Sequence, residues 1–329
     1  MSFRIDTRRR ALVSSACLAA VWPWHSAHAA NYPDRPLRMV VPGGAGGAPD
    51  LLCRVMGEAL ARDLGRPVVI DNKPGASGII GTSEIVRAAP DGYTLGYANV
   101  GTLAINKALY SKLPYDPERQ LAPVAMTGFV QNALVVRNEL PVHTVRELIE
   151  LLRKSPGKLT MASAGNGTTS HLGGELFKSM TKTFMLHVPY KGSVAAIQDL
   201  IGGGVDVMFD NLSSISPFIQ SGRVRALAVT GARRSPLFPN LPTVQEAGVP
   251  GYETVAWGGM VVPAGTPPEI IARLNAAFNT MMGQPEVRER LAKLSLETVS
   301  GPPERLFETA RRETPVWAEV VRRANARVD

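Results

Sequence analysis

Two glycine-rich segments are the features of this sequence that most clearly suggest chemistry. Residues 42–50 read Pro-Gly-Gly-Ala-Gly-Gly-Ala-Pro-Asp, and residues 163–170 read Ser-Ala-Gly-Asn-Gly-Thr-Thr-Ser. Each follows a short apolar run and precedes a segment of helical periodicity, so each is predicted to join a strand to a helix. Glycine lets backbone N–H groups turn toward a ligand, and the N-terminus of the next helix favours an anion.

A plainer interpretation is that both segments are ordinary strand–helix turns. Thr168, Thr169 or Ser170 would then only cap the second helix. For one segment alone, the two interpretations are evenly balanced. Two segments of the same kind, one in each half of the chain, favour an anion-binding cleft at the carboxyl ends of the strands.

Polar residues after other predicted strands could also face this cleft. Lys191 is either a ligand contact or a solvated turn lysine, and Asp210 and Asn211 either orient ligand groups or tie down turns. His171 follows the second segment and could touch a ligand, but a packing or capping role is favoured. His187 lies in an apolar, strand-like setting, so we expect it to be structural, and neither histidine stands in a metal-binding spacing.

Familiar catalytic and cofactor motifs are absent from the sequence. There is no G-x-x-x-x-G-K-[ST] and no G-x-S-x-G, and the first segment does not spell G-x-G-x-x-G. The chain has 2 Cys and 5 His without ligand spacing, so we expect no metal and no cofactor. Its net charge of +8 comes from scattered basic residues without interleaved aromatic residues, which does not indicate a nucleic-acid partner.

The elements that would position these residues alternate along the chain, as in an α/β protein with mainly parallel sheets. The predicted strands are residues 37–41, 68–70, 94–98, 130–136, 159–163, 187–190, 205–209, 224–229 and 255–262. The predicted helices are residues 51–64, 79–89, 145–154 and 170–180, followed by a helical block from about residue 268. Pro315 should kink or interrupt the last helix.

A chain of 329 residues exceeds what one hydrophobic core usually supports, so we expect two lobes. The extended segments near residues 126–136 and 253–262 are the predicted crossings between them. Lobe I would comprise residues 31–128 and 254–329, and lobe II residues 129–253. Two crossings would form a double hinge, with the ligand in the cleft between the lobes.

Residues 1–29 are predicted to be a signal peptide. Four Arg within the first ten residues precede an apolar stretch over residues 11–24, and Ala27-His28-Ala29 supplies the small residues of a cleavage site after Ala29 or Ala30. The apolar stretch is too short to span a bilayer and contains Pro23. We therefore expect an exported, periplasmic protein.

Several longer blocks resemble the Bug family of periplasmic solute receptors, the binding component of tripartite tricarboxylate transporters. The blocks are residues 32–38, 74–78, 89–94, 162–167, 187–192, 241–244 and 263–267. They cover essentially the whole chain after the predicted signal peptide. Several such blocks in register are far more specific than either glycine-rich segment alone.

This resemblance implies a two-lobed type II periplasmic binding protein that closes like a Venus flytrap and catalyses no reaction. It implies a small organic acid or amino acid as ligand, membrane permease subunits as partner, and a monomer. The ligand carboxylate would be held through backbone groups and ordered waters of the first segment and polar groups of the second lobe. The implied ligand-binding residues are Gly43, Gly44, Ala45, Gly46, Gly47, Ala48, Asp50, Ser163, Ala164, Gly165, Asn166, Thr168, Thr169 and Asp210.

The first glycine-rich segment departs from the family. Members usually read Pro-Phe-Pro-Pro-Gly-Gly-Ser/Gly-Thr-Asp, whereas this chain has Gly43 and Gly44 in place of Phe and Pro, and Pro49 in place of Thr. Pro49 removes a hydroxyl and a backbone donor, but it suits the first turn of a helix. We therefore predict a roomier pocket for a ligand bulkier than a short dicarboxylate, including an aromatic acid.

Two other functions remain open on the sequence. The protein could report its ligand to a membrane sensor instead of a permease. An exported hydrolase could use Ser163 or Thr169 near His171, although no nucleophile–base–acid spacing supports it.

Overall fold

The computed structural model describes residues 32–324 and 326, so the predicted signal peptide lies outside the described residues. The strands, in chain order, are β1 (Leu37–Val41), β2 (Val68–Asn72), β3 (Thr94–Asn99), β4 (Leu121–Val136), β5 (Thr160–Ser163), β6 (Leu186–Pro189), β7 (Val207–Asn211), β8 (Arg225–Val229), β9 (Val255–Pro263) and β10 (Leu296–Thr298). The α-helices are α1 (Ala48–Leu64), α2 (Ile79–Arg87), α3 (Asn106–Leu109), α4 (Pro117–Gln120), α5 (Val145–Lys154), α6 (Thr169–Thr181), α7 (Ser193–Ile201), α8 (Leu212–Gln220), α9 (Pro268–Gly283), α10 (Pro285–Lys293) and α11 (Arg305–Ala324). Two other short helices are η1 (Ala76–Gly78) and η2 (Gly101–Ile105).

The strands form two groups joined by one long strand. In the first group β1 pairs in parallel with β2 and β3, and in the second β5 pairs in parallel with β6 and β7. The strand order is β2-β1-β3-β9-β4-β7-β5-β6, with β8 and β10 also paired to β4. The α/β class is confirmed, but the sheet is mixed, because β4 and β9 run antiparallel to their neighbours.

The long strand β4 passes from one group to the other. Its residues 121–131 pair with β9, whereas residues 132–136 pair with β7. The pairing register shifts near Gly128, whose φ is 147° and where a Cβ would lie 2.2 Å from the carbonyl oxygen of Glu297. Only glycine fits this close, irregular pairing.

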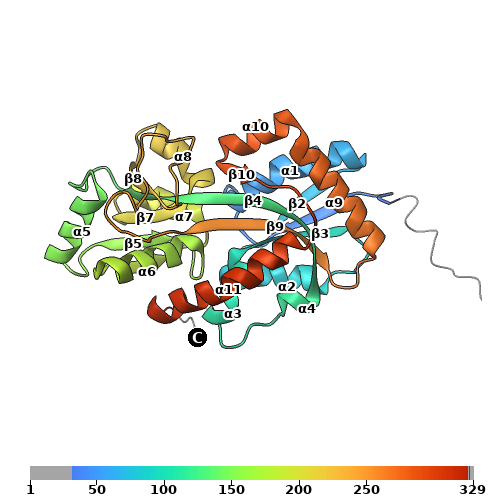
Figure 1. Ribbon diagram of the computed structural model, residues 1–329, viewed down its shortest axis with the longest axis horizontal. Helices are drawn as coiled ribbons and strands as arrows, with labels where there is room; N and C mark the ends of the chain where they lie inside the picture. Colours follow the sequence, from blue (N-terminus) through green and yellow to red (C-terminus); the bar gives the residue numbers. More distant parts are fainter. Residues whose placement is uncertain (1–31, 325, 327–329) are drawn as a thin grey trace, which may run out of the picture.

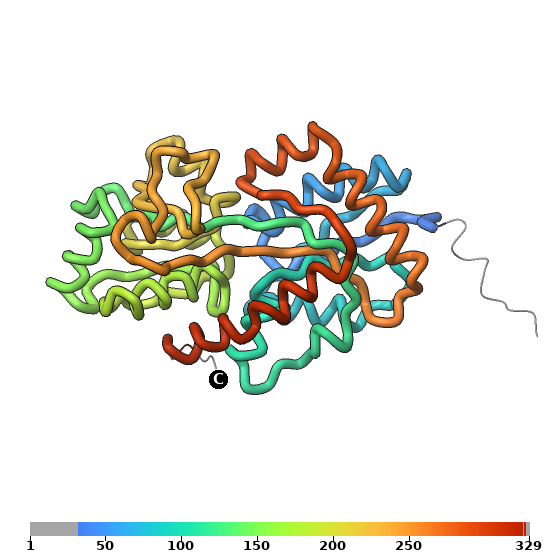
Figure 2. The backbone as a smooth tube through the Cα atoms, in the orientation of Figure 1, coloured from blue at the N-terminus to red at the C-terminus, as the bar shows by residue number. Residues whose placement is uncertain are grey.

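Strands β4 and β9 run side by side between the two halves of the molecule (Figure 1), and the tube of Figure 2 shows the chain crossing along the same two strands. They occupy the segments that the sequence predicted as crossings. The boundary predicted after residue 128 falls inside β4, and the boundary predicted after residue 253 falls just before β9. The division into lobes at those residues stays a prediction.

Helices cover both faces of each half, as their apolar stripes require. In the first half, α1, α9 and α10 pack on one face of the sheet, and α11 and η2 pack on the other. In the second half, α5 and α6 cover one face, and α7 and α8 the other. Cys53 of α1 is fully buried, and burial raises the pKa of its thiol.

The last helix, α11, continues through Pro315, so of the predicted kink or interruption, the interruption is wrong. A proline inside a helix costs about 3 kcal/mol or more. Burial of Leu306 and Trp317 in the core offsets that cost. Trp257 of β9 also donates its indole N–H to Glu313 of α11 over 2.6 Å. Packing against β9, η2 and α6 therefore keeps the helix continuous.

Candidate functional site

A cavity of about 590 Å³ lies where loops at the carboxyl ends of strands from both halves meet. The loops after β1, β2 and β3 line one side, and the loops after β5, β6 and β7 line the other. The long strands β4 and β9 contribute Val130 and Trp257. The volume falls within the range of roughly 300–1,000 Å³ that is typical of small-molecule sites.

The first glycine-rich segment forms one wall. Its lining residues from the predicted site are Gly43, Gly44, Ala45, Gly47 and Ala48, and Pro42 and Pro49 also line the cavity.

Gly46 and Asp50 belong to the predicted site but are not among the residues that line the cavity. Asp50 is buried, accepts the backbone N–H of Gly46 at 2.8 Å and pairs with Arg54. Burial raises the pKa of Asp50, but the hydrogen bonds from Arg54 and Gly46 outweigh it and leave the pKa below its ordinary value. The ionised carboxylate therefore holds the loop in shape. Pro49 stands in the first turn of α1, as expected.

The second glycine-rich segment forms the facing wall. Its lining residues from the predicted site are Ala164, Gly165, Asn166, Thr168 and Thr169, whereas Ser163 is not among the lining residues.

Thr168 caps α6, because its Oγ1 accepts the backbone N–H of His171. The same hydroxyl donates to the carbonyl oxygen of Gly165 over 2.7 Å. The capping interpretation is therefore right, and it does not conflict with the ligand interpretation, since Thr168 also faces the cavity. Gly165 and Gly167 have φ of 131° and 70°, which only glycine adopts without strain.

Asp210, at the end of β7, lies in the cavity wall and is 1% exposed. The hydroxyl of Ser193 donates to its Oδ1 over 2.8 Å. Its Oδ2 is buried and has no hydrogen-bond partner among the described residues. Burial raises the pKa of Asp210 to about 7. Lys191, for which the sequence left two interpretations, also lines the cavity.

Several lining residues were missing from the predicted site. They include Pro74, Gly75, Ala76, Ser77, Asn99, Gly101, Tyr110, Tyr190, Ser193 and Val194. Most of them directly follow β2, β3 or β6, so the rule that ligands bind beyond the carboxyl ends of strands could have found them. Tyr110 follows α3 instead, and no local pattern marks it.

The two sides of the cavity touch each other directly. The hydroxyl of Ser77, after β2, donates to the carbonyl oxygen of Asn166 over 2.6 Å, and it also bonds to Tyr110 over 2.8 Å. A Cβ on Gly44 would lie 3.6 Å from the carbonyl oxygen of Lys191. The cleft is therefore closed in this structure.

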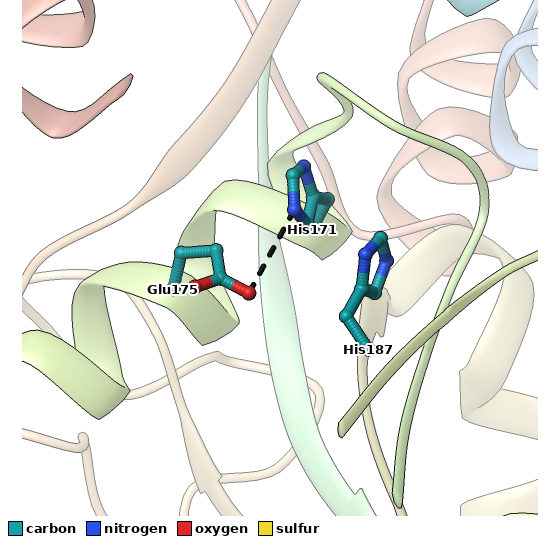
Figure 3. Close-up of side chains that lie close together, drawn as sticks. All are labelled: His171, Glu175 and His187. Atoms are coloured by element: carbon teal, nitrogen blue, oxygen red, sulfur yellow. Dashed lines mark ion pairs between the residues drawn. The ribbon is translucent and has the colours of Figure 1, made fainter. Parts of the chain in front are cut away.

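His171, Glu175 and His187 lie together behind the second segment (Figure 3), with candidate ligand atoms within 4.8 Å of one another. Their arrangement does not suit a metal ion. The two imidazole rings are stacked with centroids 4.1 Å apart and planes 17° apart, so one ion cannot lie in the plane of both rings. The ammonium of Lys178 already binds Glu175 over 2.7 Å.

The two histidines are neutral parts of the structure. Burial lowers the pKa of His171 to about 3 and that of His187 to about 4. The dashed contact of 3.7 Å between His171 and Glu175 in Figure 3 is thus not an ion pair at neutral pH. Gly167 donates its N–H to Nδ1 of His171, which fixes the loop. The expectation that both histidines are structural agrees with these contacts.

The hydrolase hypothesis paired Ser163 with His171, and that pairing is wrong. Ser163 bonds to Nε2 of His187 over 2.7 Å, not to His171. Its side chain is fully buried and does not line the cavity, so it cannot reach a bound substrate.

Comparisons with known proteins agree with this architecture. The profile described as tripartite tricarboxylate transporter family receptor matches residues 52–325. The chain is 36% identical to Protein BugT of Bordetella pertussis, over 91% of this chain and 92% of that one.

Two solved structures are also similar. R. palustris Rpa4515 with adipate has a TM-score of 0.88 and 37% identity, covering 90% of this chain and 100% of that one. MatC from Rhodopseudomonas palustris with bound malate has a TM-score of 0.82 and 33% identity, covering 88% of this chain and 100% of that one. The chain belongs to the family of tripartite tricarboxylate transporter receptors, which are periplasmic solute-binding proteins and not enzymes.

Proposed function

We propose that this protein captures a small organic acid in the cleft between its two lobes and presents it to the permease of a tripartite tricarboxylate transporter. The observation that carries the proposal is the cavity at which α1, α6 and α7 all begin. Helix N-termini favour negative charge, and three of them around one cavity favour an anion. The similar structures with adipate and malate support a carboxylic acid as that anion.

The binding residues that we propose are those predicted from the sequence. Of these, the lining residues of both glycine-rich segments and Asp210 are the candidates for direct contact. Gly46, Asp50 and Ser163 would act by holding the loops, since their hydrogen bonds run within the protein. Lys191 is the candidate counter-charge for the bound acid.

The size of the cavity supports a ligand larger than a short dicarboxylate. Gly43 and Gly44 stand where the family usually has Phe and Pro, so this wall lacks the bulk of those side chains. A Cβ on Gly43 would make only an ordinary contact, with Pro49 at 3.5 Å. We therefore retain aromatic and medium-chain acids as candidate ligands.

We propose that the protein works in the periplasm as a monomer, after cleavage near Ala29 or Ala30. No helix among the described residues has both the length and the apolar character to cross a bilayer. Closure of the lobes over the acid would exclude water and create the surface that the permease recognises.

Thermal unfolding of the purified protein with a panel of ligands tests this proposal. The panel contains succinate, malate, adipate, benzoate, nicotinate, terephthalate and several amino acids. A ligand at about a hundred times its Kd should stabilise the fold by about 2.7 kcal/mol, a shift of several degrees. Stabilisation by one or more acids, followed by calorimetric titration and recovery of the unchanged acid, supports a receptor. The absence of binding by every acid would contradict the proposal, provided that mass spectrometry finds no acid already bound.

A further inference from the structure

Asp210 lies in the wall of the cavity, and one of its two carboxyl oxygens has no hydrogen-bond partner among the described residues. It is the only acidic side chain among the described residues that line it. Ser193 occupies Oδ1, while Oδ2 is buried without a hydrogen-bond partner among the described residues. A buried polar atom usually has a partner, so an unpaired one in a binding cavity points to a ligand.

Among the described residues, no basic side chain forms an ion pair with Asp210 or lowers its pKa. The charged and titratable groups on and beside the elements packed around β7 are Arg137 after β4, His171, Glu175 and Lys178 on α6, His187 on β6, Tyr190 and Lys191 before α7, Asp199 on α7, Asp206 before β7, and Arg225 on β8. None of them contributes to the shift in the pKa of Asp210, which burial raises to about 7 while the hydrogen bond from Ser193 opposes it.

Most of these groups are already engaged with one another. Arg137 pairs with Asp206 over 2.8 Å, and Lys178 binds Glu175. Asp199 accepts a hydrogen bond from Tyr190, and Arg225 donates to backbone carbonyl oxygens, including that of Leu140.

Resting on the function proposed above, we propose that Asp210 carries its proton when the acid is bound and donates a hydrogen bond from its Oδ2 to the ligand carboxylate. An ionised Asp210 would repel a carboxylate in a cavity of low dielectric constant. The neutral acid instead supplies the donor that the unpaired oxygen lacks. The hydroxyl of Ser193 fixes the other oxygen, so the proton is directed to Oδ2.

This protonation makes affinity depend on pH. The pKa of Asp210 in the ligand-free protein is raised to about 7. Above that pH, binding of an acid requires Asp210 to take up one proton. The Kd of the acid should then rise with pH by up to about tenfold per unit, until the pKa of the complex is reached. An ionised Asp210 would give the opposite preference, for a ligand with an ammonium group.

Calorimetric titration from about pH 6 to about pH 9 tests the inference. The probe is the acid that binds most tightly among succinate, malate, adipate, benzoate and terephthalate. We expect weaker binding above pH 7 and uptake of up to one proton, measured in buffers of different ionisation enthalpy. In Asp210→Asn the amide N–H replaces the acid proton, so binding should persist and lose its pH dependence.

Two further variants separate this role from a structural one. Ser193→Ala removes a hydrogen bond that lowers the pKa of Asp210, so the fall in affinity should move to higher pH. Glu139→Gln changes a carboxylate with a 66% exposed side chain and should leave the pH profile as in the wild type.

A wild-type Kd that does not change with pH would overturn the inference while leaving the receptor function intact. So would a pH dependence retained in Asp210→Asn, or preferential binding of 1,6-diaminohexane that tightens as pH rises. Failure of every acid in the panel to bind at any pH would instead overturn the proposed function.

Discussion

Individual glycines decide the shape of the cavity wall, but they do so for different reasons. Gly46 has φ of 76°, and a Cβ there would lie 3.2 Å from Val194 across the cleft. Gly44 has ordinary backbone angles, and a Cβ there would meet the carbonyl oxygen of Lys191 at 3.6 Å. Position 46 therefore requires glycine for its backbone conformation, whereas position 44 has room for a small side chain.

Alanine at these two positions should therefore have different effects on stability. Gly46→Ala forces a left-handed conformation and should lower the free energy of unfolding by about 1–2 kcal/mol. Gly44→Ala should change it by less than about 0.5 kcal/mol, because its contact is ordinary and alanine restricts the unfolded chain. Urea denaturation of the ligand-free protein measures both values. Equal losses would show that the backbone angle of Gly46 carries no strain.

The stacked histidines predict a loss of stability in acid. Their ordinary pKa is 6.5, whereas burial lowers those of His171 and His187 to about 3 and about 4 in the folded protein. Below pH 6.5 the unfolded chain therefore binds protons that the folded protein does not, and the free energy of unfolding falls as pH falls. Asp210, with its pKa raised to about 7, acts in the opposite direction: its contribution is lost as pH rises toward 7.

The variant His187→Gln isolates the histidine contribution. Its amide oxygen can still accept the hydroxyl of Ser163, but it does not titrate. The stability difference between wild type and variant should shrink by about 1–2 kcal/mol between about pH 7 and about pH 5. Chemical denaturation across that range measures it. A difference that stays constant with pH would mean that His187 is protonated equally in both states.

At the scale of elements, helix starts place backbone donors at the cavity. The residue preceding α6, Thr168, serves as its cap and lines the cavity. Thr144 caps α5 with a capping box to Glu147, but it is not among the lining residues. Both caps are threonine side chains that accept a backbone N–H, but only Thr168 lies at the cavity. Variants of the two residues therefore distinguish an effect on stability from an effect on ligand binding.

Alanine at either cap should lower the free energy of unfolding by about 1 kcal/mol, because an exposed helix donor loses its acceptor. Only Thr168→Ala should also weaken binding of the panel acid, since the start of α6 would fray at the ligand. Denaturation gives the first quantity, and calorimetric titration gives the second. An equal effect of both variants on affinity would show that the N-terminus of α6 does not contribute to ligand binding.

On the scale of the whole molecule, a side-chain hydrogen bond joins the two sides of the cavity. The hydroxyl of Ser77 bonds to Asn166 and Tyr110 and so links the loop after β2 to the loop after β5. The long strands β4 and β9, with the register shifts of β4, are the elements about which the halves would move. The contact of Ser77 thus belongs to the closed form.

Removal of this hydroxyl should favour the open form. In Ser77→Ala we expect a larger radius of gyration without ligand, measured by small-angle X-ray scattering, and affinity for the panel acid reduced several-fold. Ser221→Ala is the control, because its hydroxyl bonds only to carbonyl oxygens at the end of its own helix, α8. An unchanged radius in Ser77→Ala would show that this contact does not hold the cleft closed.

The sequence by itself determined what depends on neighbours along the chain. Alternating apolar runs gave the α/β class, Gly65 ended α1 in a left-handed conformation, and Pro49 was compatible with its first turn. The glycine-rich strand–helix loops predicted both glycine walls, and the blocks that resemble the Bug family predicted the receptor class. Strand and helix periodicity, helix termini and glycine turns are effects of local backbone sterics and hydrogen bonding, which a short window of sequence contains.

Only the tertiary structure decided which distant groups meet. It paired Ser163 with His187, brought Ser77 and Tyr110 to the cavity, and placed Gly46 and Asp50 outside its lining. It also kept α11 continuous through Pro315, because burial of Trp317 and its neighbours outweighs the local cost. Such contacts depend on how the two halves pack across β4 and β9, and no local pattern in the sequence records that packing.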